Sequence, residues 1–251
     1  MSRPVFELRN VSRRFGDLTA LDGLTFDVLP GELVALVGPS GAGKTTLINL
    51  LNGSLLPTGG TIRLLGSDPA ALSTPELRRV QQRIGTVYQQ FHLVRALRVV
   101  HNVNAGHLGE WPLPKAALSL VWPQEVDAAQ RVLARVGIPE KLHERTGDLS
   151  GGQQQRVAIA RVLAQSPDVI LADEPIASLD PGHSRAIMDL LRDLSIETGI
   201  TLIASLHSIE YAFSHCQRII GLREGRMVFD APPDAVSPSM VDELYRVEGR
   251  W

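Results

Sequence analysis

The strongest chemical signal in this sequence is a glycine-rich segment, GPSGAGKT at residues 38–45, which matches the spacing GxxxxGK followed by Ser or Thr. We call it the phosphate loop. Glycines at these positions let backbone N–H groups turn inward around an anion, and the N-terminus of a following helix adds its dipole. Lys44 can then reach the terminal phosphates of a nucleotide, and the Thr45 hydroxyl can ligate Mg²⁺. The alternative is a glycine-rich turn that carries a lysine by chance.

Two acidic residues, Asp173 and Glu174, directly follow the apolar run at 169–172. Beside a phosphate loop, such a strand brings its first acid close enough to hold Mg²⁺, directly or through water. The second acid, Glu174, can orient or deprotonate an attacking water. Solvated acids at an ordinary strand end would be the simpler interpretation if the phosphate loop were absent.

A second potential anion site lies at LSGGQ, residues 149–153, ahead of a helical pattern at 155–163. Ser150 is a natural helix N-cap, and the two glycines after it are expected to leave N-terminal amides exposed. The alternative is an ordinary capped helix start. The position of the segment, between the phosphate loop and the acidic pair, favours a role in the same site.

Strands and helices alternate around these residues. Apolar residues two apart in 5–29 predict antiparallel strands with turns at Gly16-Asp17 and Asp22-Gly23. The run Leu33–Val37, bounded by glycine, predicts a strand buried on both faces, and a helix is expected from Lys44 to about Leu51. Further strands are expected at 61–65, 84–88, 169–172, 201–205 and 219–222, with mostly helical structure from 93 to 165, clearest at 124–136, and a short helix after 237.

The composition excludes several classes of protein. With 44% hydrophobic and 21% charged residues in 251, the chain is expected to fold around a large core. A net charge of -2 argues against broad nucleic-acid binding. The single cysteine, Cys216, excludes an internal disulfide framework and fits a reducing compartment. We expect no signal peptide and no membrane span, because no apolar run reaches about 18 residues.

Six motifs in a fixed order give the chain a family resemblance. After the phosphate loop come Gln89 in VYQQF, LSGGQ, VILADE at 169–174, the segment at 177–180 and His207 in LIASLHS. They resemble the Walker A, Q-loop, signature, Walker B, D-loop and switch-histidine motifs of ATP-binding cassette (ABC) transporter ATPases. The likeness covers essentially the whole chain.

The resemblance implies an enzyme that uses ATP and Mg²⁺, with signature residues of one copy closing the site of another. The residues expected to be catalytic are Glu174, His207, Gln89 and Lys44, and those expected to hold Mg²⁺ are Thr45, Gln89 and Asp173. Nucleotide contacts are expected from Phe15, Gly38, Pro39, Ser40, Gly41, Ala42, Gly43, Lys44, Thr45, Thr46, Ser150, Gly151, Gly152, Gln153 and Asp180. Phe15 occupies the family's adenine-stacking position, although a core position between strands stays open.

The resemblance also implies an α/β P-loop NTPase (RecA-like) core with an N-terminal antiparallel β subdomain and an inserted helical subdomain. The single domain 1–251 would divide into a nucleotide-binding core, 1–88 plus 166–251, and a helical signature subdomain, 89–165. The stretch 107–123 is unusually apolar and proline-rich, so Trp111 or Trp122 is expected near a permease. The alternative there is a surface loop with a small core of its own.

The cargo is suggested by segments at 89–94, 206–212, 216–222 and 225–230, which resemble the ATPases of phosphonate importers. The function implied is ATP-driven uptake of phosphonate, phosphite or a related oxyanion, by a homodimer on the cytoplasmic face of the bacterial inner membrane. Its partners would be an integral-membrane permease and, indirectly, a periplasmic or lipoprotein solute-binding protein. The alternatives are ATPases of phosphate or amino-acid transporters, or of lipoprotein or macrolide exporters. Ser208 and Ile209 depart from the commoner Gln-Val of the importers.

Overall fold

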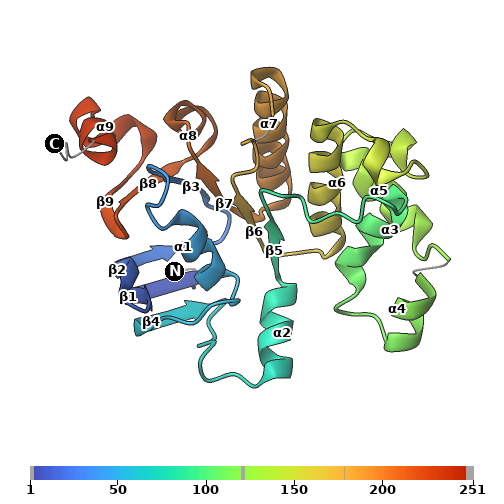
Figure 1. The fold of residues 1–251 in the computed structure, drawn as a ribbon, viewed down its shortest axis with the longest axis horizontal. Helices are drawn as coiled ribbons and strands as arrows, with labels where there is room; N and C mark the ends of the chain where they lie inside the picture. The colour runs from blue at the N-terminus through green and yellow to red at the C-terminus, as the bar shows by residue number, and fades with distance from the viewer. Residues whose placement is uncertain (1–2, 120–121, 178, 247–251) are drawn as a thin grey trace.

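The computed structural model describes residues 3–119, 122–177 and 179–246, which form two β-sheets and the helices around them (Figure 1). The smaller sheet is antiparallel, with strand order β2-β1-β4. Its strands are β1 (Phe6–Phe15), β2 (Leu18–Val28) and β4 (Gly59–Leu64).

One turn predicted in this sheet is wrong. Strand β2 runs straight through Asp22-Gly23. Gly23 adopts a φ of 68° there and its N–H donates to the Ser12 hydroxyl at 2.9 Å, while the register between β1 and β2 shifts nearby. An irregularity in a long strand therefore replaces the turn, a use of glycine that sequence pattern alone does not separate from a reversal.

The larger sheet has six strands in the order β5-β6-β7-β3-β8-β9. They are β3 (Leu33–Val37), β5 (Ile84–Val87), β6 (Val169–Asp173), β7 (Thr201–Leu206), β8 (Arg218–Arg223) and β9 (Arg226–Ala231). All neighbours are parallel except β9, which pairs antiparallel with β8. The sequence analysis predicts the first five and misses β9, which follows a tight turn at Glu224-Gly225.

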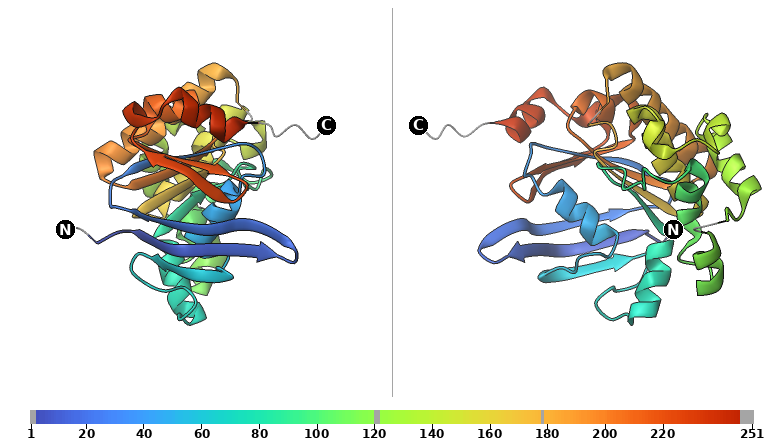
Figure 2. Two further views of the ribbon diagram at one scale, coloured as in Figure 1. Left: turned by 90° about the vertical axis from the view of Figure 1, so that its left-hand side faces the viewer. Right: turned by 45° about the vertical axis from the view of Figure 1, so that its right-hand side comes forward.

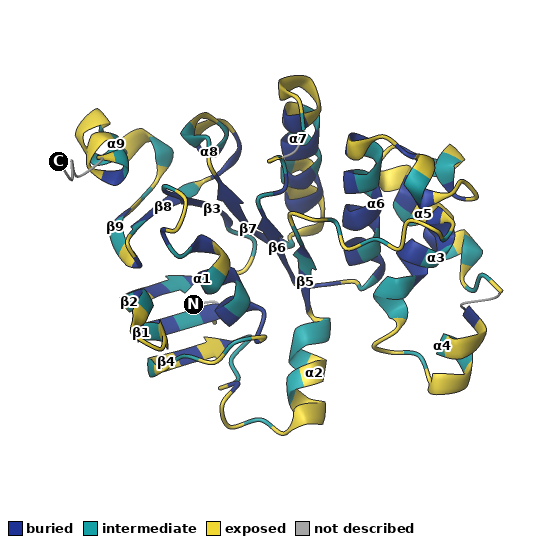
Figure 3. Ribbon diagram, viewed as in Figure 1, coloured by how far each residue is buried: buried dark blue, intermediate teal, exposed yellow. Residues whose placement is uncertain are grey.

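The two faces of the six-stranded sheet carry different helices. Leu33, Ala35 and Val37 belong to the core on one face, with α6 (Gly151–Ala164) and α7 (Pro181–Thr198). Val34 and Leu36 face the other way, into a core shared with α1 (Lys44–Leu51) and the antiparallel sheet. Figure 2 shows α1 lying between the two sheets. The central strands are buried on both faces, as the uninterrupted apolar runs predict (Figure 3).

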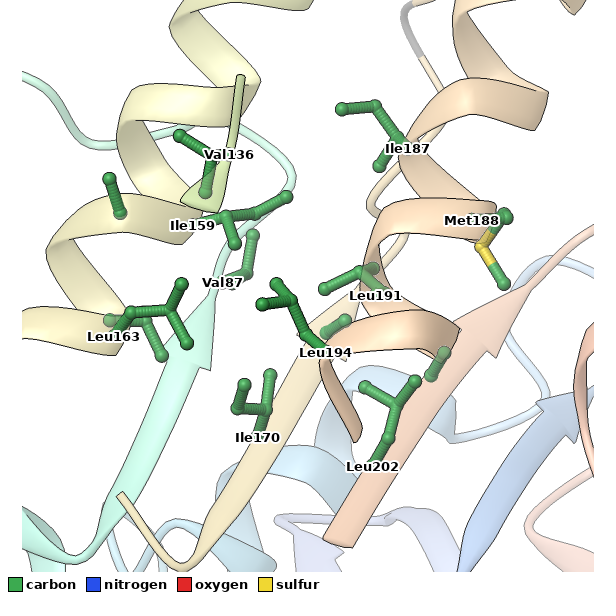
Figure 4. Close-up of a cluster of buried hydrophobic side chains, with 14 of the residues drawn as sticks. Val87, Val136, Ile159, Leu163, Ile170, Ile187, Met188, Leu191, Leu194 and Leu202 are labelled. Carbon is green, nitrogen blue, oxygen red and sulfur yellow. The ribbon is translucent and has the colours of Figure 1, made fainter. Parts of the chain in front are cut away.

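Packing of α6 and α7 on the sheet is close and apolar. Figure 4 shows the side chains that meet there: Ile159 and Leu163 of α6, Ile187, Met188, Leu191 and Leu194 of α7, and Val87, Ile170 and Leu202 of the strands. Full burial of one such side chain stabilises the fold by roughly 1.5–3 kcal/mol. This core fixes α6 against the edge of the sheet.

The remaining helices complete the fold. They are α2 (Thr74–Gln82), α3 (Val99–Asn104), α4 (Leu113–Ser119), α5 (Val126–Arg135), α8 (Ile209–His215) and α9 (Pro238–Tyr245), with 3-10 turns at Ala105–His107, Pro139–Lys141, Thr146–Asp148 and Pro233–Ala235. Helices α3 to α6 gather beyond β5, at the right of Figure 1. Helices α2, α7 and α8 are not among the elements predicted from the sequence. Across the described ranges, no helix has both the length and the apolar character to cross a bilayer.

Candidate functional site

The phosphate loop, the acidic pair and His207 gather where three neighbouring parallel strands end. The phosphate loop follows β3. Asp173 is the last residue of β6 and Glu174 comes directly after it, and His207 follows β7. These strands are adjacent in the order β6-β7-β3, so their carboxyl ends share one edge of the sheet. The topology thus brings together side chains that are far apart in the sequence.

The phosphate loop needs its glycines for both conformation and space. Gly38, Gly41 and Gly43 have φ values of 149°, 80° and 101°. A Cβ at Gly38 would stand 2.0 Å from the Leu222 carbonyl oxygen. Helix α1 begins directly after Gly43 with no side-chain cap, so its first backbone amides are open to an anion.

Lys44 lies inside the loop rather than in solvent. Its residue exposure is only 5%, and its Nζ donates to the carbonyl oxygens of Gly38 at 2.7 Å and Pro39 at 3.0 Å. Burial lowers the pKa of Lys44, while the negative charges of Glu174 and Asp173 act in the opposite direction. The ammonium group is therefore held at the loop by backbone carbonyl oxygens.

Ser205 connects the acidic pair, and sequence analysis does not single it out. Its hydroxyl donates to Asp173 Oδ1 at 2.7 Å and accepts the Glu174 N–H at 2.8 Å. The Thr45 hydroxyl donates to the same Asp173 oxygen at 3.3 Å. One signal for Ser205 exists in the sequence: it is the single hydroxyl residue of the apolar run 202–206, two residues before His207.

Thr45 and Asp173 present the donor set that Mg²⁺ prefers at phosphates. A hydroxyl and a carboxylate side by side suit a cation that keeps several waters and takes its other ligands from the nucleotide. Within the described residues, no group of three His, Cys, Asp or Glu side chains forms an all-protein metal site. The two residues therefore fit Mg²⁺ brought in with a nucleotide.

Glu174 and His207 form a close pair at this edge. His207 Nε2 lies 2.5 Å from Glu174 Oε1, and the Glu174 side chain is 15% exposed against 45% for His207. Glu174 adopts a φ of 50°, in the left-handed region, where residues other than glycine are strained. The hydrogen bond from Glu174 N–H to Ser205 holds that conformation, so the carboxylate is aimed by the backbone as well as by His207.

A cavity of about 510 Å³ opens over the phosphate loop. It is lined by Phe15, Leu18, Thr19, Ala20, Ser40, Gly41, Ala42, Gly43, Lys44, Thr45, Thr46, Glu174 and Glu224. Phe15 is 43% exposed, with the Arg13 guanidinium 4.5 Å from its ring centre, so the alternative of a core phenylalanine is wrong. Glu224, on the β8–β9 turn, is a further lining residue that no sequence motif marks.

Gln89 is not brought into this cavity. It is exposed in a turn after β5 and lines a separate hollow of about 670 Å³ with Leu149 and Gly151 of its own chain. The expectation that Gln89 touches Mg²⁺ or the attacking water is therefore not met by the arrangement within this single chain. The turn follows β5, the edge strand of the sheet, whereas the other site residues follow β3, β6 and β7.

The signature residues lie at the start of α6, away from the phosphate loop. The Ser150 hydroxyl accepts the Gln153 N–H at 3.3 Å, and the Gln153 side chain accepts the Ser150 N–H at 3.0 Å, which confirms the predicted cap. Gly151 is exposed, but Gly152 is buried, and a Cβ there would stand 2.9 Å from the His183 ring. Gly151 therefore lies at the surface, whereas Gly152 packs against His183.

Asp180 caps helix α7. Its carboxylate accepts the N–H groups of Gly182 and His183, both at 3.1 Å, and lies 2.5 Å from His183 Nδ1. The hydrogen bond from His183 holds the pKa of Asp180 below its usual range. Ser178, in the predicted D-loop, lies outside the described residues.

The described part of the stretch 107–123 is partly helical. Its residues Leu113, Leu118 and Trp122 are 86%, 55% and 70% exposed, so these described residues do not build the small separate core of the alternative. Trp111 instead stacks on His107, with ring centres 5.4 Å apart, and the Lys115 ammonium lies 4.6 Å from the centre of the Trp111 ring. Leu120 and Val121 lie outside the described residues.

Comparison with known sequences gives consistent matches. The family model described as ABC transporter matches residues 21–177, more than half of the chain. The chain is 43% identical over 247 residues to the phosphonates import ATP-binding protein PhnC of Pseudomonas putida, covering 98% of this chain and 92% of the relative. It is 46% identical over 242 residues to phosphonates import ATP-binding protein PhnC 1 of Pseudomonas syringae, covering 96% and 91%.

Solved structures match over similar lengths. The ATP-binding cassette MJ0796, in a dimeric post-hydrolysis state bound to ADP and Pi, is 31% identical with a TM-score of 0.77, covering 91% of this chain and 98% of that one. The cbiO1 protein from Clostridium perfringens, part of the ABC transporter complex cbiONQ, is 30% identical with a TM-score of 0.81, covering 96% and 93%.

Proposed function

This chain belongs to the ABC transporter family as an ATP-hydrolysing subunit, and from that premise we propose that it drives uptake of phosphonates, phosphite or related oxyanions through a separate permease. The observation that carries the ATPase function is the shared strand edge with its two contacts, Thr45 to Asp173 and Glu174 to His207. The cargo is supported by relatives such as PhnC of Pseudomonas putida, named for phosphonate import.

We assign the cavity over the phosphate loop to ATP. Phe15, exposed at one side of the cavity, supplies a ring face for the adenine. The triphosphate lies along residues 38–46, where the open amides at the start of α1 meet phosphate oxygens. Lys44 leaves the carbonyl oxygens of Gly38 and Pro39 for the β- and γ-phosphates.

Mg²⁺, when bound, supplies positive charge at the phosphate oxygens, and Thr45 and Asp173 are the residues placed to hold it. Ser205 fixes the orientation of the Asp173 carboxylate by its hydrogen bond. Gln89 joins this set only after its turn moves toward the strand edge.

Hydrolysis needs a base aimed at the water that attacks the γ-phosphorus. Glu174 accepts the proton of that water as the new P–O bond forms and the bond to the ADP oxygen breaks. His207 and the Ser205 contact with Glu174 N–H hold the carboxylate in place. When ATP is bound, His207 donates a hydrogen bond to the γ-phosphate. The position of the His207 ring then depends on whether the γ-phosphate is present.

The site is completed by a second copy of the chain. Helices α1 and α6 pack on opposite faces of the sheet, so one chain does not bring Ser150 next to its own Lys44. Ser150, Gly151, Gly152 and Gln153 of the second copy close the open side of the triphosphate, with Asp180 near the seam. The dimeric state of the related cassette MJ0796 supports this arrangement. ATP then stabilises the closed dimer by mass action.

The partners follow from the family. The dimer works with an integral-membrane permease, indirectly with a periplasmic or lipoprotein solute-binding protein, and at the cytoplasmic face of the bacterial inner membrane. No nucleic acid takes part. In this proposal the helices at 89–165 face the permease, and 1–88 with 166–251 form the nucleotide-binding core. The exposure of Trp122 supports a contact there.

The assembled complex of ATPase, permease and binding protein tests this proposal. We expect methylphosphonate or phosphite, loaded on the binding protein, to stimulate ATP hydrolysis at least several-fold over the unloaded complex. Phosphate and an amino acid serve as controls. Stimulation by a control alone would leave the ATPase function in place and overturn the phosphonate cargo, whereas an inactive complex would overturn the function itself.

A further inference from the structure

The turn that carries Gln89 has an unusual backbone. The Phe91 N–H donates to the Tyr88 carbonyl at 3.1 Å, which closes the turn around Gln89 and Gln90. Phe91 and His92 then follow with φ values of 39° and 47°, two successive side-chain-bearing residues in the left-handed region. Such a conformation persists only where the surrounding structure holds it.

Arg161 of α6 provides that hold. Its Nη1 donates to the His92 carbonyl at 2.7 Å and its Nη2 to the Phe91 carbonyl at 2.9 Å. One planar guanidinium thus spans both strained residues, a geometry that a lysine ammonium does not reproduce. The Tyr88 and His92 rings, 4.8 Å apart, pack in the same region.

Arg161 is committed to these carbonyl oxygens. Burial lowers its pKa, and among the described residues no carboxylate forms an ion pair with it. Arg161 is half-buried, so the two carbonyl oxygens replace part of the water around its guanidinium. Releasing the turn would remove both of these hydrogen bonds.

Helix α6 connects this contact to the signature residues. Positions 151 to 161 are separated by about 15 Å at the usual rise of ~1.5 Å per residue. Gln89 also shares its hollow with Leu149 and Gly151, at the first end of the helix. The Gln89 turn is thus hydrogen-bonded to Arg161 of α6 and lines one hollow with Gly151 at the start of the same helix.

We propose that Arg161 is a positioning residue that fixes the Gln89 turn to helix α6, so that Gln89 and the signature residues move as one body when the dimer closes. The proposal rests on the proposed function, because it explains how closure brings Gln89 to the nucleotide. Arg161 itself touches no nucleotide and acts through Gln89.

Arg156 offers a matched control on the same helix. Its Nη1 donates to the Val136 carbonyl at 2.5 Å, inside the helical region and away from the Gln89 turn. Arg156→Met removes an arginine–carbonyl contact of the same kind without touching Phe91 or His92. An effect of Arg161→Met that Arg156→Met lacks is therefore not a general effect on α6.

The first experiment needs no hydrolysis. A nitroxide is attached at Gln90→Cys, since Gln90 is exposed, while Cys216 is buried with a pKa raised by burial to about 12 and resists labelling. In Arg161→Met we expect the label to become mobile, and in Arg156→Met to keep its original spectrum. An unchanged spectrum in Arg161→Met would overturn the proposal, whatever the fate of the ATPase function.

The second experiment is a double-mutant cycle on ATPase turnover. Arg161→Met is expected to lower kcat about 10-fold with less than a twofold change in KM for ATP, and Gln89→Ala to lower it by a similar factor. Because one acts through the other, the double variant should be no slower than Gln89→Ala alone. If the loss of kcat in the double variant equals the product of the losses in the two single variants, Arg161 acts independently of Gln89 and the proposal is overturned.

Arg161→Lys distinguishes loss of the paired hydrogen bonds from loss of the fold. It keeps the charge and is expected to fold with a Tm close to that of the parent, yet to restore less than half of the lost kcat, because an ammonium lacks the two-pronged geometry. Full recovery of kcat and label immobility by Lys would show that charge alone suffices and would overturn the role of the paired contact. If the parent itself hydrolyses no ATP, the proposed function fails, and the label spectra still decide the fate of the Arg161 contact.

Discussion

Helices α1 and α6 both begin with glycine-rich segments, but their N-termini differ. Helix α1 follows Gly43, has no side-chain cap and leaves its first amides free beside the buried Lys44. Helix α6 follows Ser150, whose hydroxyl and backbone are paired with Gln153 in a capping box. The first helix end has no side-chain cap, whereas at the second the Ser150 hydroxyl caps the Gln153 N–H.

This difference assigns separate tasks to the two ends. An uncapped terminus with a buried lysine favours anion binding by one chain alone. The capped terminus of α6 still has a free hydroxyl proton on Ser150, because that oxygen accepts rather than donates in its cap. We therefore expect binding to depend on α1 within one chain, and turnover to depend on α6 of a second chain.

The largest expected effect is at the base beside α1. Glu174→Gln should lower the hydrolysis rate about 10³-fold, within the range for loss of a general base, and leave ATP binding intact. Phosphate release measures the rate, and light scattering should show the doubled mass of an ATP-bound dimer. Glu224→Gln, in the same cavity, is the control and should stay within a few-fold of the parent. Equal loss in both variants would argue against a specific base.

The next effect tests the α6 end. Ser150→Arg should lower hydrolysis about 100-fold, because in the proposed dimer a bulky cation would replace a hydroxyl that faces the partner's triphosphate. ATP affinity of the dilute monomer, measured with a fluorescent analogue, should stay within about twofold of the parent. Weak ATP binding by that monomer would mean that the two helix ends do not have separate tasks.

The α1 end should show the opposite behaviour. Lys44→Ala should weaken ATP binding about 10- to 100-fold, since charge-assisted hydrogen bonds to phosphate are lost. Equilibrium titration of the monomer measures it. Lys115→Ala, a lysine whose ammonium lies over Trp111, provides the control and should bind ATP normally. Unchanged affinity in Lys44→Ala would contradict the assignment of the cavity to the triphosphate.

The smallest expected effect tests the role of Ser205 between Asp173 and Glu174. Ser205→Ala should lower kcat about 3- to 10-fold, because Asp173 and the Glu174 backbone both lose a hydrogen bond. Thr201→Val is matched to it, since the Thr201 hydroxyl accepts the Gly31 N–H at the other end of β7. Steady-state kinetics on both variants measures the difference. A larger loss in Thr201→Val would place the effect in stability of the strand, not in positioning of Glu174.

The local elements were predictable where one interaction dominates. The helix from Lys44 to Leu51 and the cap at Ser150 follow from neighbouring residues, and both are confirmed. Strand β9 and helix α7 were missed, because their apolar residues are explained by packing on distant elements and their periodicity alone is weak. The turn at Asp22-Gly23 was wrong for the same reason, since pairing with β1 extends the strand through the glycine.

The sequence by itself determined the family, the phosphate loop, the acidic pair and the fold class, because these depend on residue types at short spacings. Only the tertiary structure decided that Ser205 joins Asp173 to Glu174, that Phe15 is exposed, and that Gln89 lies apart from the loop. It also put α1 and α6 on opposite faces of one sheet. Strand order and register are set by packing across the whole chain, so residues far apart in the sequence acquire their neighbours only when the sheet forms.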